Sequence, residues 1–258
     1  MLPGYRSPAS YLRFVPLAVS LLFLAFLMFQ SEQRKQDTDF LKIVKSNDLK
    51  AVEALIKSGR DPNTRDTAGR TVLMEAARYS TPEMVSFLIQ HGANVNDRND
   101  YGETALMVTR NTEIARILIA HGVDVNARAK VGDTPLLMAA GYGGKGQVEL
   151  LLDHGAKVNE ADTDGMTPLM MAKDVTIANL LLVQGADVRA ITKDGWTCLM
   201  YARYDADLLK LLLAHGTDIN ARNNTGTTVL GLVLQEKNVS TEQMAPIEKL
   251  LRKAGAQE

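Results

Sequence analysis

Two patterns of apolar residues divide the chain. Residues 14–29 (FVPLAVSLLFLAFLMF) form an apolar run without a charged residue, and the chain is polar from Gln30 to Thr38. From residue 39 onward, short groups of apolar residues recur at helical spacing and alternate with polar segments rich in Gly, Asn and Asp. The pattern predicts one apolar helix at the amino terminus, followed by a body of short amphipathic helices.

The apolar run has the features of an export signal or a membrane anchor. Arg6 and Arg13 precede it, and its length falls between about 7–15 residues for a signal-peptide core and about 17–25 residues for a spanning helix. Its exit, Leu27 to Gln30, lacks the small residues of a cleavage site. We therefore expect an uncleaved transmembrane signal-anchor at residues 14–30, between an n-region at 1–13 and a linker at 31–38. A buried amphipathic helix is the alternative, although a run that is apolar all round shows no helical period and does not favour it.

The charges around this run predict its orientation. Beyond the run, Arg34 and Lys35 are offset by Glu32, Asp37 and Asp39, whereas both arginines and the free amine precede it. By the positive-inside rule, the n-region lies in the cytoplasm and the body outside it, which favours a bacterial inner membrane with the body facing the periplasm. A cleaved, soluble periplasmic or secreted protein is the alternative.

The body repeats one pattern at a period near 33 residues. A first motif, G-x-T-x-L, is followed in constant register by a second motif, in which two apolar residues precede a variable residue, His or Gln, and Gly. The first motif begins at Gly69, Gly102, Gly132, Gly165, Gly195 and Gly226, and the second ends at Gly92, Gly122, Gly155, Gly185 and Gly216. Two motifs in one register predict a structural repeat throughout the body.

Each repeat carries signals for two short helices. Thr precedes the first helix as its N-cap, and Thr81 and Pro82 open a second helix in the same way. The glycine of the second motif supplies the left-handed residue that ends the second helix. The next segment is extended, and we expect its asparagines to hydrogen bond within their own turn. These are Asn96, Asn126, Asn159 and Asn220.

Two helices followed by an extended finger at this period resemble the ankyrin repeat. The resemblance implies an all-α fold, which is a solenoid of paired antiparallel helices with β-hairpin-like fingers over residues 39–258, preceded by the one transmembrane or signal helix. Residues 39–65 correspond to an N-terminal cap, and the six repeats start near residues 66, 99, 129, 162, 192 and 223.

The sequence departs from the ankyrin pattern in three ways. The family's His after T-x-L is replaced, which predicts apolar packing in place of a polar bond. The replacements are Met74, Met107, Leu137, Met170, Met200 and Gly231. Repeats of 30 or 31 residues lack residues at the turn between the helices, and the last repeat carries an insertion, LQEKNVSTEQMAP, before a second helix at IEKLLRKAGA.

Charge and reactive side chains exclude several classes of function. The chain has 29 Lys and Arg against 30 Asp and Glu, a balance that does not suit a nucleic-acid binder. The lone Cys198 has no neighbouring His to activate it, and the segment from Gly141 to Gly146 lacks the G-K-[ST] ending of a phosphate-binding loop. We therefore expect no enzyme activity, cofactor or metal. An enzyme or small-ligand binder is the less favoured alternative.

The histidines are explained by the repeat. His91, His121, His154 and His215 precede the helix-ending glycine, where a ring nitrogen can bond the last carbonyls of the helix. Equivalent positions in a stacked array stand about 10 Å apart, so no two of these side chains can share a metal ion.

The remaining aromatic residues point to a binding surface. In the ankyrin family, the ends of the first helices and the fingers line a concave face that holds protein partners, and Tyr, Trp and Arg dominate protein-binding hot spots. The residues in these places are Arg78, Tyr79, Tyr101, Arg110, Tyr142, Lys173, Trp196, Tyr201, Arg203 and Tyr204. We expect a membrane-tethered adaptor that grips a partner protein through this face.

Overall fold

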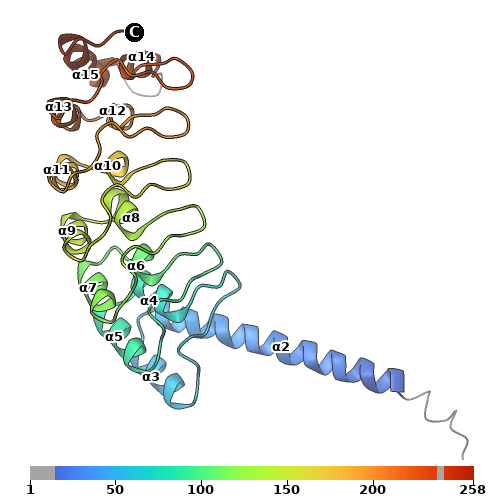
Figure 1. The fold of residues 1–258 in the computed structure, drawn as a ribbon. Coiled ribbons are helices and arrows are strands. Elements are labelled where there is room, and N and C mark those ends of the chain that lie inside the picture. Colours follow the sequence, from blue (N-terminus) through green and yellow to red (C-terminus); the bar gives the residue numbers. More distant parts are fainter. Residues whose placement is uncertain (1–14, 237–240) are drawn as a thin grey trace, which may run out of the picture.

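The computed structural model describes residues 15–236 and 241–258, with side chains at 22–236 and 244–258. Helix pairs stack into a curved solenoid, and loops project from one side of it as fingers (Figure 1). The inner helices, next to the fingers, are α4 (Val72–Tyr79), α6 (Ala105–Val108), α8 (Pro135–Tyr142), α10 (Pro168–Met171), α12 (Cys198–Tyr201) and α14 (Val229–Gln235). The outer helices are α3 (Leu49–Lys57), α5 (Pro82–Gln90), α7 (Thr112–Ala120), α9 (Lys145–Asp153), α11 (Val175–Val183), α13 (Ala206–Ala214) and α15 (Thr241–Lys253). The predicted all-α solenoid is confirmed.

One apolar core runs through the stack. It extends from Phe40 to Leu251, and the leucines of G-x-T-x-L occupy equivalent buried places in it. These are Leu73, Leu106, Leu136, Leu169, Leu199 and Leu230. The residues that replace the family's His are also buried in five repeats, as at Met74 (3% exposed) and Met200 (0%), which confirms the predicted apolar packing.

Repeat length determines where the inner helix ends. The 33-residue repeats carry the eight-residue helices α4 and α8, whereas α6, α10 and α12 in the shorter repeats have four residues each. The predicted Thr caps are present in four inner helices, where the Thr oxygen accepts a backbone N–H at the third helical position. Thr104 and Thr197 make no such bond.

The fingers contact one another through their backbones. In the third repeat, Gly132 has φ +88°, and a Cβ there would lie 2.6 Å from the Thr163 nitrogen of the next finger. This close approach allows the Thr163 N–H to donate to the Val131 carbonyl at 2.9 Å. The described residues contain no strand, and the hairpin character is limited to two isolated bridges, one of them between Arg65 and Thr71.

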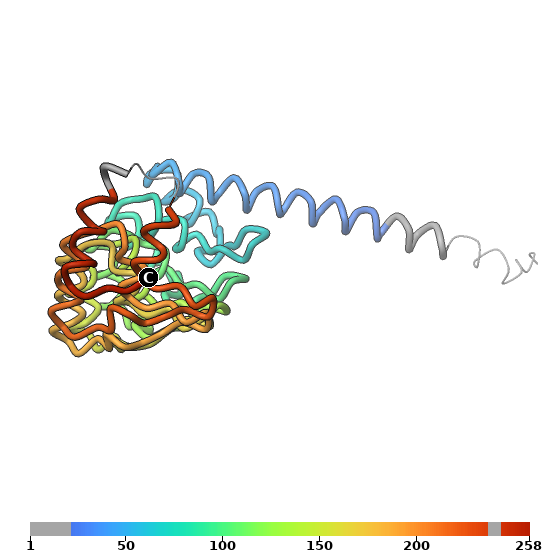
Figure 2. Tube along the Cα trace, turned by 90° about the horizontal axis from the view of Figure 1, so that it is seen from above, coloured from blue at the N-terminus to red at the C-terminus, as the bar shows by residue number. Residues whose placement is uncertain are grey.

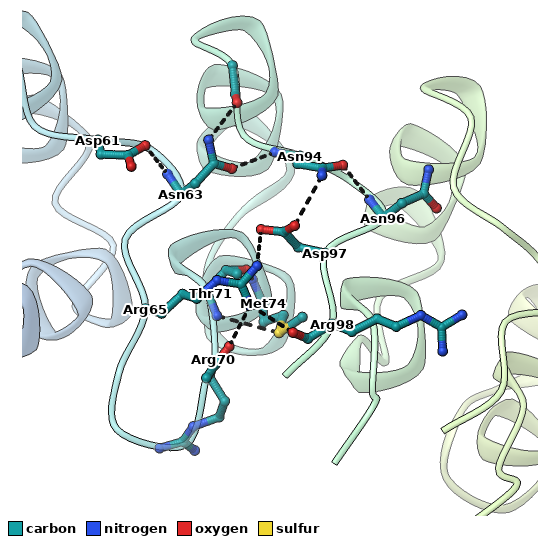
Figure 3. Close-up of polar contacts among 12 residues, drawn as sticks. Asp61, Asn63, Arg65, Arg70, Thr71, Met74, Asn94, Asn96, Asp97 and Arg98 are labelled. Carbon is teal, nitrogen blue, oxygen red and sulfur yellow. Dashed lines mark hydrogen bonds and ion pairs between the residues drawn. The ribbon is translucent and has the colours of Figure 1, made fainter. Parts of the chain in front are cut away.

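The Asn that recurs in the extended segments of the repeats has a different role from the predicted one. The Asn63 amide donates to the Gly92 carbonyl at 3.0 Å and accepts the Asn94 N–H at 2.8 Å, both in the following repeat (Figure 3). The four asparagines predicted to bond within their own turn make the same two contacts across a joint. That prediction was wrong, because the left-handed glycine leaves backbone groups unpaired beside the neighbouring Asn. We name this contact the Asn staple.

An arginine two residues later adds a second contact at some joints. Arg65 donates to the Arg98 carbonyl at 2.7 Å and pairs with Asp97 at 2.6 Å (Figure 3). We name this contact the Arg staple.

The amino-terminal helix is continuous with the solenoid. Helix α2 (Val15–Lys45) buries Phe40, Leu41 and Val44 against the first repeats, and its other end projects away from the stack (Figures 1 and 2). The expected linker at 31–38 is therefore helical. The n-region, Phe14 and the side chains of 15–21 lie outside the described residues. Within the part that the structure describes, no helix is long and apolar enough to cross a membrane, so the expected transmembrane helix is not supported.

The carboxy-terminal helix begins earlier than predicted. Helix α15 starts at Thr241, whereas the sequence predicts a helix from Ile247. Met244, Ile247 and Leu251 are buried at helical spacing, and this burial stabilises a helix that includes Pro246.

Candidate functional site

Most of the predicted site residues lie where the inner helices end. Arg78 and Tyr79 are the last two residues of α4, and Tyr142 is the last residue of α8. The turns that lead from α6, α10 and α12 to the outer helices carry Arg110, Lys173, and Arg203 with Tyr204. Lys45, the last residue of α2, occupies the equivalent place in the cap. We name this row the inner-helix ridge, and it consists of Lys45, Arg78, Tyr79, Arg110, Tyr142, Lys173, Arg203 and Tyr204.

Contacts between neighbouring repeats connect parts of the ridge. The Lys45 ammonium lies 4.2 Å from the Tyr79 ring centroid, and the Arg110 guanidinium lies 5.5 Å from that of Tyr142. Lys173 donates from Nζ to the Gly143 carbonyl. Lys45, Arg110 and Lys173 thus contact a group of a neighbouring repeat, whereas Arg78 and Arg203 contact rings of their own repeats. Cation–π contacts of this kind orient a cation at the surface.

The fifth repeat gathers the densest cluster. The rings of Trp196 and Tyr201 lie 5.2 Å apart, and the Arg203 guanidinium is 5.3 Å from the Trp196 centroid and 4.3 Å from the Tyr204 centroid. Arg203 also donates to the Met200 carbonyl at 2.9 Å and to the Tyr204 hydroxyl at 2.9 Å. We name these four side chains the aromatic cluster.

Both tyrosines of the aromatic cluster keep their hydroxyl protons. Burial raises the pKa of Tyr201 above its ordinary value, and the charges of Asp162 and Asp194 add to that effect. The pKa of Tyr204 is raised because its hydroxyl donates to the Glu236 carboxylate. The cluster therefore presents neutral phenols beside a guanidinium, which suits recognition by packing and hydrogen bonding.

Exposure differs among the predicted residues. Tyr79, Tyr142 and Tyr204 are 45%, 51% and 47% exposed, whereas Trp196 and Tyr201 are half-buried against the core. Tyr101, which is 63% exposed, lies on the finger beside Gly102, and no described contact joins it to the ridge. The structure thus brings nine of the ten predicted residues into the ridge and the aromatic cluster.

Sequence reasoning missed two participants. Lys45 belongs to the N-terminal cap repeat. It stands three residues before Asp48, the N-cap residue of α3, as Arg78 stands three residues before Thr81, the N-cap residue of α5. Extending the repeat register into the cap repeat would therefore have found it. Glu236 directly follows α14 within the insertion, and nothing in the sequence indicated its contact with Tyr204.

The reactive side chains have structural roles. Each histidine contacts, through Nδ1, the carbonyl of the residue four positions earlier at 2.8 Å, as predicted for the helix ends. Burial raises the pKa of Cys198 to about 11, so its thiol stays protonated at neutral pH. Among the described residues, no group of three potential metal ligands comes together. The arrangement can bind a partner, and we find no constellation for catalysis in this region.

Comparison with known proteins identifies the family. A family model of ankyrin repeats, three copies long, matches residues 40–129, 108–191 and 172–241. The chain belongs to the ankyrin-repeat family. The human ASB11 ankyrin repeat domain has a similar structure, with a TM-score of 0.71 and 22% identity over 85% of this chain and 98% of that one. This likeness concerns the fold.

Curated relatives match only part of the chain. Alpha-latrotoxin-Lg1a from Latrodectus geometricus is 33% identical over 92 residues, which are 34% of this chain and 7% of the toxin. An ankyrin repeat-containing protein of Schizosaccharomyces pombe is 35% identical over 60 residues, or 23% of this chain and 29% of that protein. The chain thus spans less than a third of the length of either relative.

Proposed function

We propose that this ankyrin-repeat protein is a non-enzymatic adaptor that holds a partner protein on the inner-helix ridge and the aromatic cluster. The observation that carries the proposal is the concentration of Tyr, Trp and Arg at the ends of the inner helices, densest in the aromatic cluster. Such residues dominate protein-binding hot spots because they bury a large area and lose little conformational entropy. Ankyrin-repeat proteins are in general non-enzymatic interaction scaffolds.

Variants of the aromatic cluster test the adaptor. Tyr204→Ala removes an exposed side chain, and we expect it to weaken capture of the co-purified partner at least about tenfold while stability changes by less than about 1 kcal/mol. Trp196→Ala is expected to cost stability as well, because the ring packs on the core. The control is Lys210→Ala on α13, an exposed residue paired with Asp207 at 2.8 Å. Equal capture by Tyr204→Ala and the control would contradict the proposal.

The proposed adaptor is tethered to a membrane through residues 14–30, with its repeats on the non-cytoplasmic side of a bacterial inner membrane. The support is that large apolar side chains are exposed at nearly every described position of this segment. They range from 46% exposed at Leu27 to 71% at Leu22, and include Phe23, Leu24, Phe26, Met28 and Phe29. A protein partner covers one side of a helix, whereas lipid covers all sides, and these residues surround the helix.

Helix α2 joins the proposed tether to the repeats. Arg60 of the cap pairs with Asp37 at 3.1 Å and donates to the Gln36 side chain at 3.0 Å, and both of these partners lie on α2. A tethered α2 would therefore hold the solenoid at one orientation.

Two measurements test the tether. Amino-terminal sequencing of the protein isolated from a bacterial membrane fraction should begin at or next to Met1, and protease added to spheroplasts should digest the repeats. A mature start after residue 25 would support the cleaved, soluble alternative. Repeats protected from protease would overturn the proposed orientation.

A further inference from the structure

The inner-helix ridge carries cations that lack acidic partners. Arg78, Arg110, Lys173 and Arg203 have no carboxylate within ion-pair distance among the described residues, and only Lys45 approaches one, Glu75 at 3.9 Å. Arg203 and Lys173 instead contact neutral oxygens. The chain as a whole carries a net charge of −1, so this positive row is a local segregation of charge.

The carboxylates near the ridge are already occupied. Glu75 is 5% exposed and also pairs with Arg70 at 3.4 Å. Asp174 and Asp205 cap α11 and α13 by accepting backbone N–H groups at 2.9 to 3.0 Å. Glu236 accepts the Tyr204 hydroxyl proton. The ridge cations other than Lys45 thus have no ion-pair partner among the described residues and can pair with carboxylates supplied from outside.

The spacing expected for stacked repeats matches an extended chain. Packed helices stand about 8–10 Å apart, and an extended backbone advances about 3.3 Å per residue, so one repeat corresponds to about three residues of a bound segment. The cap and the first, second, fourth and fifth repeats each supply a cation, whereas the third repeat supplies Tyr142 with Arg110 beside it. The tyrosine rings between the cations offer surfaces on which backbone or side chains can pack.

From this geometry we infer that the partner contributes an extended acidic protein segment, with carboxylates at about every third residue, that lies along the inner-helix ridge. The inference rests on the proposed adaptor function and adds the chemistry of the ligand. Arg pairs with carboxylates in a bidentate manner, and guanidinium groups already oriented on aromatic rings lose little freedom in doing so.

A binding assay with the full chain tests the inference. The probe is a fluorescein-labelled peptide of Glu-Gly-Ser repeated six times, compared with a peptide of equal composition whose six Glu are contiguous and with a Lys-Gly-Ser peptide. We expect the spaced acidic peptide to bind at least about tenfold more tightly than the Lys peptide and about threefold more tightly than the contiguous one, with affinity falling as salt rises. An equally labelled single-stranded oligonucleotide that binds more tightly would overturn the inference.

Matched variants locate the site. Arg78→Gln combined with Arg110→Gln removes two ridge cations and should weaken binding of the spaced peptide at least about tenfold, whereas Arg116→Gln on the outer helix α7, which pairs with Glu113 at 3.4 Å, should leave it within about twofold. Circular dichroism melts confirm that each variant is folded. Equal losses in both would overturn the ridge as the site.

Failure of this inference is separable from failure of the adaptor. A photo-crosslinker introduced at Tyr142 reports whether the natural partner occupies the ridge. If the partner crosslinks and the spaced acidic peptide does not reduce the crosslinking, the adaptor function is supported and the acidic segment is refuted. Absence of any crosslinked protein, together with a Tyr204→Ala variant that captures normally, refutes both.

Discussion

Two joints of the solenoid are held by different contacts. Between the second and third repeats, Asn126 and Arg128 donate to backbone carbonyls of the third repeat at 3.0 and 2.8 Å. Between the fourth and fifth repeats, Arg189 and Ile191 stand in the equivalent places, and in the described structure the side chain of neither bonds the fifth repeat. One joint thus carries an Asn staple and an Arg staple, and the other carries neither.

The joint without staples is held mainly by its fingers and its core. The Lys193 N–H donates to the Asp164 carbonyl at 2.8 Å, and the Cys198 thiol contacts the Val188 carbonyl at 3.4 Å. The aromatic cluster lies on the fifth repeat, directly beyond this joint. Both joints therefore have backbone contacts between their fingers, and they differ in their side-chain staples. We expect the staples to determine how strongly neighbouring repeats are coupled. The aromatic cluster lies beside the joint that has neither staple.

The largest effect is expected from breaking the finger contact at this joint. Gly165 has φ +84°, and a Cβ there would lie 3.0 Å from Thr192 Cα and 3.1 Å from the Ile191 oxygen. Gly165→Ala should lower the free energy of unfolding by about 1–2 kcal/mol through the left-handed backbone and by about 1–3 kcal/mol more through overpacking. Urea titration of the full chain measures it.

The control is Gly185→Ala in the same repeat. Gly185 has φ +83° and open space around its Cβ position, so only the backbone cost should appear. Equal losses in the two variants would show that the finger contact does not couple the repeats.

Removing a staple should have the next largest effect. Asn126→Ala deletes the bond to the Gly155 carbonyl and the bond from the Lys157 N–H at 2.9 Å, and we expect a loss of about 1–3 kcal/mol in the free energy of unfolding. Arg189→Ala, at the equivalent place, should change stability by less than about 0.5 kcal/mol. A loss at Arg189 as large as that at Asn126 would remove the distinction between the joints.

Adding a staple should have a smaller, stabilising effect. In Arg189→Asn, the new amide can accept the Asp218 N–H and donate to the Gly216 carbonyl, as Asn159 does for Asp187 and Gly185. We expect a gain of about 0.5–1.5 kcal/mol, with slower hydrogen exchange at Asp218. Unchanged exchange at this amide would show that the staple did not form.

The smallest expected effect concerns the Cys198 thiol, which spans the same joint. Because burial raises its pKa to about 11, alkylation by iodoacetamide at pH 8 should be slow and should report opening of the fifth repeat. The rate should rise a few-fold in Gly165→Ala and fall in Arg189→Asn. Fast alkylation of the parent protein, at the rate of the urea-unfolded chain, would contradict the burial on which this reading depends.

The sequence by itself determined the repeat and its helices. Thr caps, left-handed glycines and apolar spacing act within a few residues, so the positions of helices such as α5 and α8, and the histidine contacts at the helix ends, follow from local chemistry. Seven of the ten candidate site residues, those of the inner-helix ridge, also follow from their place in the register, because equivalent positions stack into a row.

Contacts between repeats were decided only by the tertiary structure. Asn126 can bond its own turn or the next repeat, and the close approach of a left-handed glycine across the joint selects the second. The same holds for three other features: the contact of Arg110 with Tyr142, the hydrogen bond from Tyr204 to Glu236, and the continuity of α2 with the cap. The repeat register does not predict which of these residues lie close together in space. Local signals specify which groups need partners, and stacking decides which neighbour supplies them.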